Sequence, residues 1–142
     1  MHVIDAFGVD RGSLEPLEGG GGYSWRAADL VLIPCKPSIY DLETLQTTRE
    51  LIERSGVRRP PVVVLNATVP QGTRNEQAFQ AIRGMGIAVC PVQIGQRVAF
   101  EYAGQLGQSA AEYEPDGKAA LEIRQFYMSI CRLLDISEGG GP

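Results

Sequence analysis

Four consecutive glycines, Gly19 to Gly22, are the first feature of the sequence that could bind a phosphate. Glycine-rich loops let backbone N–H groups approach a phosphate, but such a loop also needs a lysine and a serine or threonine. The chain's two lysines, Lys36 and Lys118, do not stand in a GK[ST] sequence. We therefore interpret residues 6–25 as a flexible linker rather than as a phosphate-binding loop.

The other chemically reactive side chains are three cysteines and one histidine. Cys35, Cys90 and Cys131 are far apart and form no CxxC pair, and the histidine is His2. A zinc site and a disulfide scaffold are not expected from this pattern, which is typical of buried, reduced thiols. A catalytic cysteine or serine is not supported either, because no histidine is placed to act as its base.

Composition narrows the class of protein further. A chain of 142 residues is long enough for one domain, and 44% hydrophobic with 21% charged residues is ordinary for a soluble protein. The net charge of -4 provides no overall field for binding nucleic acid. With no membrane-length apolar run and no signal peptide, we expect a cytoplasmic protein that does not bind membranes.

The elements that would position a site alternate along the chain. Four stretches are predicted to be strands: residues 2–5, 29–34, 61–66 and 87–94. The second and third are apolar on both faces, and the last is broken at Pro91. Four stretches read as helices: residues 38–56, 73–86, 95–107 and 114–136. This alternation predicts an α/β fold with a parallel sheet and flanking helices.

Local signals mark the helix ends and faces. Ser38 is expected to cap the first helix, with Asp41 in its first turn, and Thr73 with Glu76 predicts a capping box on the second. The last helix is expected to bury the apolar residues that recur at helical spacing: Ala120, Ile123, Tyr127, Ile130 and Leu134.

Ligands of parallel sheets bind at the carboxyl ends of the strands. In this chain those ends carry Asp5 and residues 34–38, 66–73 and 93–97. These segments form the functional surface that the sequence predicts.

The segments "RAADLVLIPCKPSIYDLETLQTT", "VVVLNATVPQGT" and "PVQIGQRVAFEYAGQLGQSAAEYEPDGKAALEI" resemble the second half of the ParA/MinD family. These proteins are P-loop ATPases that segregate plasmids and chromosomes. The likeness runs from about Arg26 to Leu134 and is closest to the plasmid-partition branch, through "IGQRVAF" and "YEPDGKAA". It implies a doubly wound three-layer sandwich, ATP and Mg²⁺ as cofactors, a homodimer, non-specific DNA binding and a partition adaptor protein as partner.

The resemblance also assigns roles to individual residues. Asn66 stands where the family reads the adenine edge, and an amide offers the donor and acceptor for it; it could equally be an Asn in a turn after a strand. Residues Pro91, Val92 and Ile94 would wall the base pocket. Asp5 in "HVIDAFG" resembles the Walker B aspartate that holds Mg²⁺, although a short strand ending in Asp is common.

Three cations fall in the region that resembles the family's DNA-binding surface: Arg97, Lys118 and Arg124. Phosphate contacts require little more than Arg or Lys. The alternative is a solvated face, or pairing with the nearby acids Glu114, Asp116 and Glu122.

The departure from the family is as informative as the likeness. The family's phosphate loop, with its two lysines, has no counterpart in these residues. We therefore expect a partition-type ATPase remnant, with residues 26–135 as the ParA-like domain and 136–142 as a disordered tail, that does not hydrolyse ATP alone. The alternatives are an active ATPase subunit completed by a separate chain that supplies the loop, and a non-catalytic dimerising structural domain.

The missing loop strand also affects the sheet, because in the family it lies between the Walker B strand and the "DLVLIP" strand. Residues 30–33 would then have an unpaired edge. The "HVID" strand could pair there directly, a segment of another copy could fill the gap, or two copies could pair edge to edge. Of these we favour a homodimer.

Overall fold

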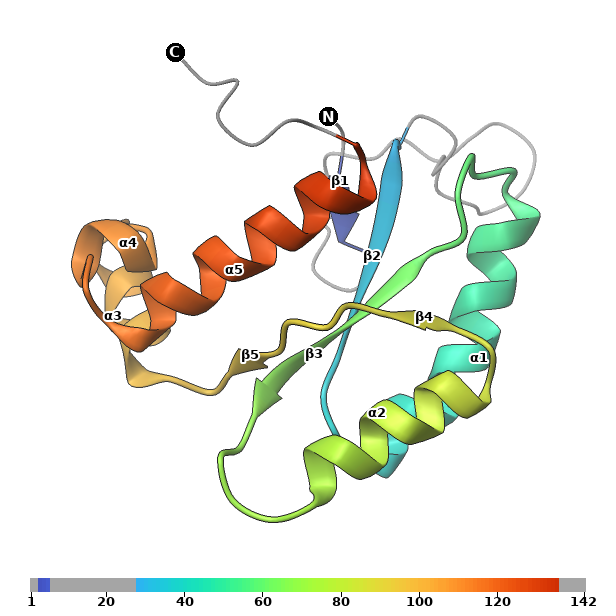
Figure 1. The fold of residues 1–142 in the computed structure, drawn as a ribbon, viewed down its shortest axis with the longest axis horizontal. Coiled ribbons are helices and arrows are strands. Elements are labelled where there is room, and N and C mark those ends of the chain that lie inside the picture. The colour runs from blue at the N-terminus through green and yellow to red at the C-terminus, as the bar shows by residue number, and fades with distance from the viewer. Residues whose placement is uncertain (1–2, 6–27, 136–142) are drawn as a thin grey trace.

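The computed structural model describes residues 3–5 and 28–135 and shows an α/β fold whose open, parallel sheet is flanked by helices (Figure 1). Its strands are β1 (Val3–Asp5), β2 (Leu30–Cys35), β3 (Val62–Thr68), β4 (Ala88–Val89) and β5 (Ile94–Gly95). Its helices are α1 (Ile39–Arg54), α2 (Arg74–Gly84), α3 (Val98–Gln105), α4 (Ala110–Tyr113) and α5 (Lys118–Leu133). Within the described ranges, no helix has the length and apolar character needed to cross a membrane. The predicted linker and tail, residues 6–25 and 136–142, lie outside the described residues.

The strands follow one another across the sheet in the order β1-β2-β3-β4, and all pairs are parallel. The last predicted strand is indeed broken at Pro91: β4 and β5 both pair with β3, one before and one after the interruption. The predicted fold class is therefore confirmed, and β3 is the central strand from which a site at the carboxyl edge would be built.

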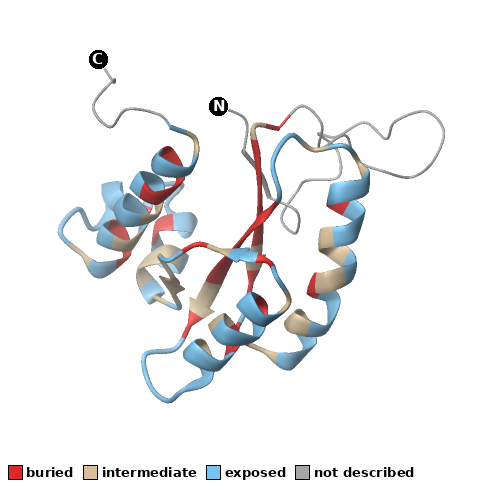
Figure 2. Ribbon diagram, turned by 45° about the vertical axis from the view of Figure 1, so that its right-hand side comes forward, coloured by how far each residue is buried: buried red, intermediate tan, exposed pale blue. Residues whose placement is uncertain are grey.

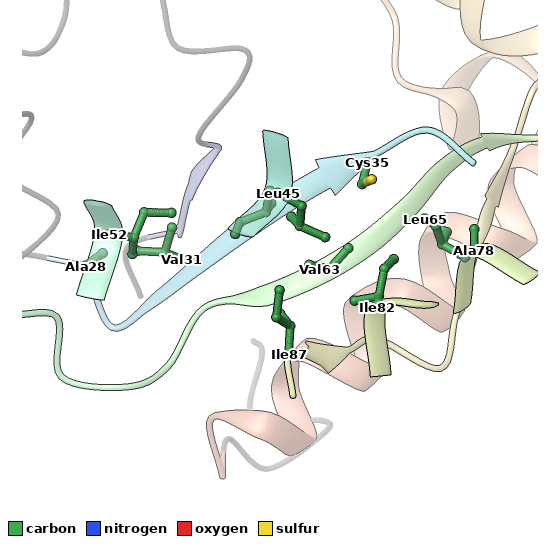
Figure 3. Close-up of a cluster of buried hydrophobic side chains, with 11 residues drawn as sticks. Ala28, Val31, Cys35, Leu45, Ile52, Val63, Leu65, Ala78, Ile82 and Ile87 are labelled. Atoms are coloured by element: carbon green, nitrogen blue, oxygen red, sulfur yellow. The ribbon is translucent and has the colours of Figure 1, made fainter. Parts of the chain in front are cut away.

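Helices α1 and α2 cover one face of the sheet (Figure 3). Side chains that alternate along β2 and β3 point to this face, where Leu45 and Ile52 of α1 and Ile82 of α2 meet them. Most of these side chains are completely buried, as expected for strands that are apolar on both faces. The cluster comprises Ala28, Val31, Ile33, Cys35, Leu45, Ile52, Val63, Leu65, Ala78, Ile82 and Ile87.

Helix α5 covers the other face. Its Ile130 joins the remaining β2 and β3 side chains and Cys90 in a second, smaller cluster, with Phe126 and Leu134 packed against it. The prediction that Ile123 and Tyr127 are buried is wrong, because their exposed fractions are 36% and 58%. They share the apolar side of α5 with Ile130, but neither belongs to the described cluster.

Strand β1 pairs directly with β2, with Val3 opposite Leu30 and Asp5 opposite Leu32. Of the three arrangements expected for the edge at residues 30–33, the structure thus shows pairing within one chain. The edge that motivated a homodimer is occupied over these residues.

The two predicted helix caps have different outcomes. The Ser38 cap is confirmed: its hydroxyl accepts a hydrogen bond from the Asp41 N–H at 3.2 Å. The capping box of Thr73 and Glu76 is wrong, because the Thr73 side chain makes no capping hydrogen bond. Thr73 has φ -100° and ψ 3°, whereas the Ncap conformation that aims a side chain at the helix N–H groups is extended.

The three cysteines are buried and unpaired, as the sequence predicted. Burial raises the pKa of the Cys35 thiol to about 11, and the negative charge of Asp41 adds to this effect. The short helix α4 was not expected from the sequence. It begins with a capping box in which Ser109 accepts from the Glu112 N–H and the Glu112 carboxylate accepts from the Ser109 N–H.

Candidate functional site

The carboxyl end of β3 is the most unusual stretch of backbone in the sheet. Asn66 lies opposite Ile94 and Thr68 lies opposite Gly95, and the register shifts between these two pairs. Ala67, between them, has a φ of 52°. A residue with a side chain seldom adopts this left-handed conformation, and such strained positions concentrate at functional sites.

Hydrogen bonds hold the end of β5 against the end of β3. The Gln96 N–H donates to the Thr68 carbonyl oxygen at 2.9 Å. The Thr68 hydroxyl, on a buried side chain, donates to the Ile94 carbonyl oxygen at 3.4 Å. These contacts hold the backbone that follows Asn66 against β5.

Asn66 itself is half-buried. Among the described residues its amide group has no hydrogen-bond partner, in contrast to Asn75, whose Nδ2 donates to the Val69 carbonyl oxygen at 2.6 Å. The Asn66 amide therefore keeps a donor and an acceptor for a ligand at the edge of the sheet.

The predicted walls of the base pocket are only partly assembled around Asn66. Ile94 lies on the neighbouring strand, directly opposite Asn66. Val92 and Ile94 are half-buried and pack against the α5-side cluster, whereas Pro91 is exposed. The structure thus joins Asn66 with Ile94 and leaves Pro91 at the surface.

The predicted metal ligand lies elsewhere. The backbone of Asp5 pairs with Leu32, which in turn pairs with Val62, the first residue of β3. Asp5 is thus two strands across and four residues back from Asn66, on the order of 15 Å at ordinary strand spacing and rise. The structure does not bring the two together, and no group of three or more His, Cys, Asp or Glu in the described ranges could hold a metal ion.

Arg97, the first predicted DNA contact, faces a carboxylate instead of open solvent. Its Nε and Nη2 donate to the two oxygens of Glu122 at 3.0 and 2.6 Å, and the Gly95 N–H donates to Glu122 Oε2 at 3.2 Å. The Arg97 hydrogen bonds hold the pKa of the Glu122 carboxyl below its usual value. A Cβ atom at Gly95 would lie 3.3 Å from Glu122 Oε1, so the glycine permits this close approach.

The other two predicted DNA contacts are both on α5. Arg124 donates from Nη1 to the Pro115 carbonyl oxygen at 3.2 Å. Lys118 is the exposed first residue of the helix, and its positive charge contributes to the lowered pKa of Glu122. Arg97 thus pairs with a nearby acid, Glu122, which was the alternative to DNA binding that the sequence left open.

A cavity of about 540 Å³ lies at the amino-terminal ends of α1 and α2. None of the residues predicted to bind nucleotide, metal or DNA lines it. The lining residues are Pro37, Ser38, Ile39, Tyr40, Leu42, Arg74, Gln77, Ala78 and Ala81. Two of these residues, Pro37 and Ser38, belong to the predicted functional segment 34–38. The cavity itself and the strained backbone of Ala67 could not be predicted, because neither depends on periodicity or composition.

Comparison with known proteins adds no relative: no protein-family model matches the chain, and no curated protein matches it either. The resemblance to the ParA/MinD family therefore depends on the quoted segments alone.

Proposed function

We propose that this chain is a ParA-like partition or positioning protein that keeps a site for an adenine base at the end of β3 and does not hydrolyse ATP by itself. The observation that carries the proposal is the unpartnered Asn66 amide beside Ile94, at a strained turn of the strand. Folds with a parallel sheet bind their ligands at the carboxyl ends of the strands, and Asn66 lies near such an end.

The expected chemistry is binding without turnover. Phosphoryl transfer depends on positioning and charge neutralisation at the phosphates, for which this sequence has no glycine-rich loop with lysine. Contacts to the base alone are expected to give weak binding, with a dissociation constant of about 1 mM. By resemblance to the family, ATP and Mg²⁺ remain the proposed ligands, with Asp5 as the proposed Walker B residue.

Titration of the ¹⁵N-labelled chain with adenosine and guanosine tests the proposal. Adenosine is expected to shift the amide resonances of residues 66–68 and 94–97, and guanosine is not. Asn66→Asp removes the amide donor and should abolish the shifts. The exposed Gln105→Glu makes the same chemical change on α3 and should leave them intact.

Two results would contradict this proposal. Equal shifts with guanosine would mean that the amide does not read the base. Magnesium-dependent ATP turnover by the purified chain, lost on Asp5→Ala, would show an active ATPase instead of a remnant.

One observation favours a second candidate, a dimerising structural domain. Ile123 and Tyr127 stay exposed on the apolar side of α5, between positions that are buried. The two residues are four positions apart on α5 and so are neighbours on its surface, and contiguous exposed apolar patches are typical of protein interfaces.

A further inference from the structure

The lobe formed by α3 and α4 is built with its large apolar side chains outward. Ala103 and Ala110 are buried in it, whereas Val98, Tyr102 and Leu106 are exposed by 59%, 48% and 64%. These three residues recur every four positions, so they form one stripe along α3. Figure 1 shows α3 and α4 beside the first turns of α5, away from the sheet, and much of the surface in Figure 2 at these helices is exposed.

The stripe extends onto α4 through an aromatic pair. The ring centroids of Tyr102 and Tyr113 are 6.3 Å apart, with an interplanar angle of 47°. The result is a continuous apolar surface of Val98, Tyr102, Leu106 and Tyr113, which we call the α3 stripe.

The charges around the α3 stripe are mainly negative. Between Val98 and Gly117 the sequence has four carboxylates and no Lys, Arg or His: Glu101, Glu112, Glu114 and Asp116. The nearest preceding cation, Arg97, is neutralised by Glu122. Two cations follow on α5, Lys118 and Arg124, and Arg124 Nη1 donates to the Pro115 carbonyl oxygen at 3.2 Å, so the four carboxylates still outnumber the cations at this surface. An apolar stripe with acidic surroundings is complementary to an apolar stripe with basic surroundings.

We infer that the α3 stripe is a docking surface for a basic amphipathic helix of a partner protein. Leucine-like side chains of that helix would cover Tyr102 and Leu106, and its lysines or arginines would face Glu101, Glu114 and Asp116. A second copy of this chain fits less well, since two such surfaces would bring like charges together. Duplex DNA fits less well for the same reason, because its phosphates are anionic.

Binding of three fluorescent peptides of about 14 residues to the full chain tests this inference. The first is an amphipathic Leu/Lys helix, the second replaces every Lys by Glu, and the third replaces every Leu by Ser. The Leu/Lys peptide is expected to bind at least about tenfold more tightly than either of the others, and more weakly as salt is raised.

Surface variants locate the binding site. Leu106→Ser and Val98→Ser are expected to weaken the Leu/Lys peptide about tenfold each. The matched control is Tyr40→Ser on α1, whose side chain is 78% exposed and distant in sequence, and which should bind as the wild type does. Circular dichroism of each variant checks that the fold is retained.

Four outcomes would overturn the inference. Equal binding of all peptides, or binding that Leu106→Ser leaves unchanged, would mean that the α3 stripe is not the docking surface. A dimer that Leu106→Ser converts to a monomer would assign the stripe to a second copy. Binding of duplex DNA that is weakened by Leu106→Ser would assign it to nucleic acid.

Discussion

Ala67 occupies a left-handed backbone conformation that glycine adopts without strain, so its replacement by glycine is expected to stabilise the protein. The expected gain in the free energy of unfolding is about 1 kcal/mol. The matched control is Ala81→Gly within α2, where the side chain is exposed and glycine should cost about 1 kcal/mol. Urea denaturation measures both. Equal losses would show that Ala67 is not strained.

Glu122 is expected to stabilise the fold through its bonds to Arg97 and the Gly95 N–H. Its side chain is only 18% exposed, so Glu122→Gln should cost about 2 kcal/mol at pH 7. The exposed Glu101→Gln is the control and should change stability by less than about 0.5 kcal/mol.

The same carboxylate predicts a dependence on pH. The folded-state pKa of Glu122 is lowered, so its contribution is present above the unfolded-state pKa of about 4.3 and is lost as pH falls through the lower, folded-state value. Wild type and Glu122→Gln should therefore differ in urea midpoint at pH 7 and converge in acid. A difference that grows in acid would contradict the assigned partner.

At the scale of the helix, Ser38 and Thr73 test which caps stabilise their helices. Ser38→Ala removes the acceptor of the Asp41 N–H and should lower the free energy of unfolding by about 1 kcal/mol. Thr73→Ala removes a side chain with no capping bond and should be nearly neutral. Thermal unfolding of the two variants measures the contrast; equal losses would show that Thr73 caps α2 in solution.

The elements themselves could largely be predicted from the sequence. Residues 30–33 and 62–65 are apolar on both faces, which is typical of a strand that is covered on both sides, and the structure buries them in this way. Pro91 interrupts the last strand, as expected. Helical spacing found α5 but placed Ile123 and Tyr127 inside, because periodicity gives the direction of a side chain and not what packs opposite it.

The candidate site was less predictable. The position of Asn66 at the end of a strand follows from local pattern, but the turn at Ala67 depends on how β5 pairs with β3, some 28 residues away in the sequence. The same holds for Arg97, for which three nearby acids were possible partners and tertiary packing selected Glu122. Contacts between distant segments leave no periodic signal in the chain.

At the scale of the whole molecule, the second candidate function predicts a homodimer through the exposed side of α5. Light scattering at micromolar concentration should give twice the 15.4 kDa of one chain. Tyr127→Ser is expected to shift the species to a monomer, because its side chain is 58% exposed and contributes apolar area to the interface. Leu51→Ser on α1, where the side chain is 54% exposed, should leave the mass unchanged.

A monodisperse monomer at all concentrations would rule this dimer out. It would agree with the pairing of β1 with β2, which closes that edge within one chain.

The reaction rates of the three buried thiols can report how often different parts of the molecule open. Cys35 belongs to the α1 and α2 side of the sheet, Cys90 to the opposite cluster, and Cys131 to α5. A thiol-specific dye can label them only when the surrounding structure opens, so each labelling rate reports one local opening free energy. The cluster under α5 is the smaller of the two, so we expect α5 to detach more often than α1 and α2. Cys131 should therefore be labelled before Cys35, which remains protected by its own cluster.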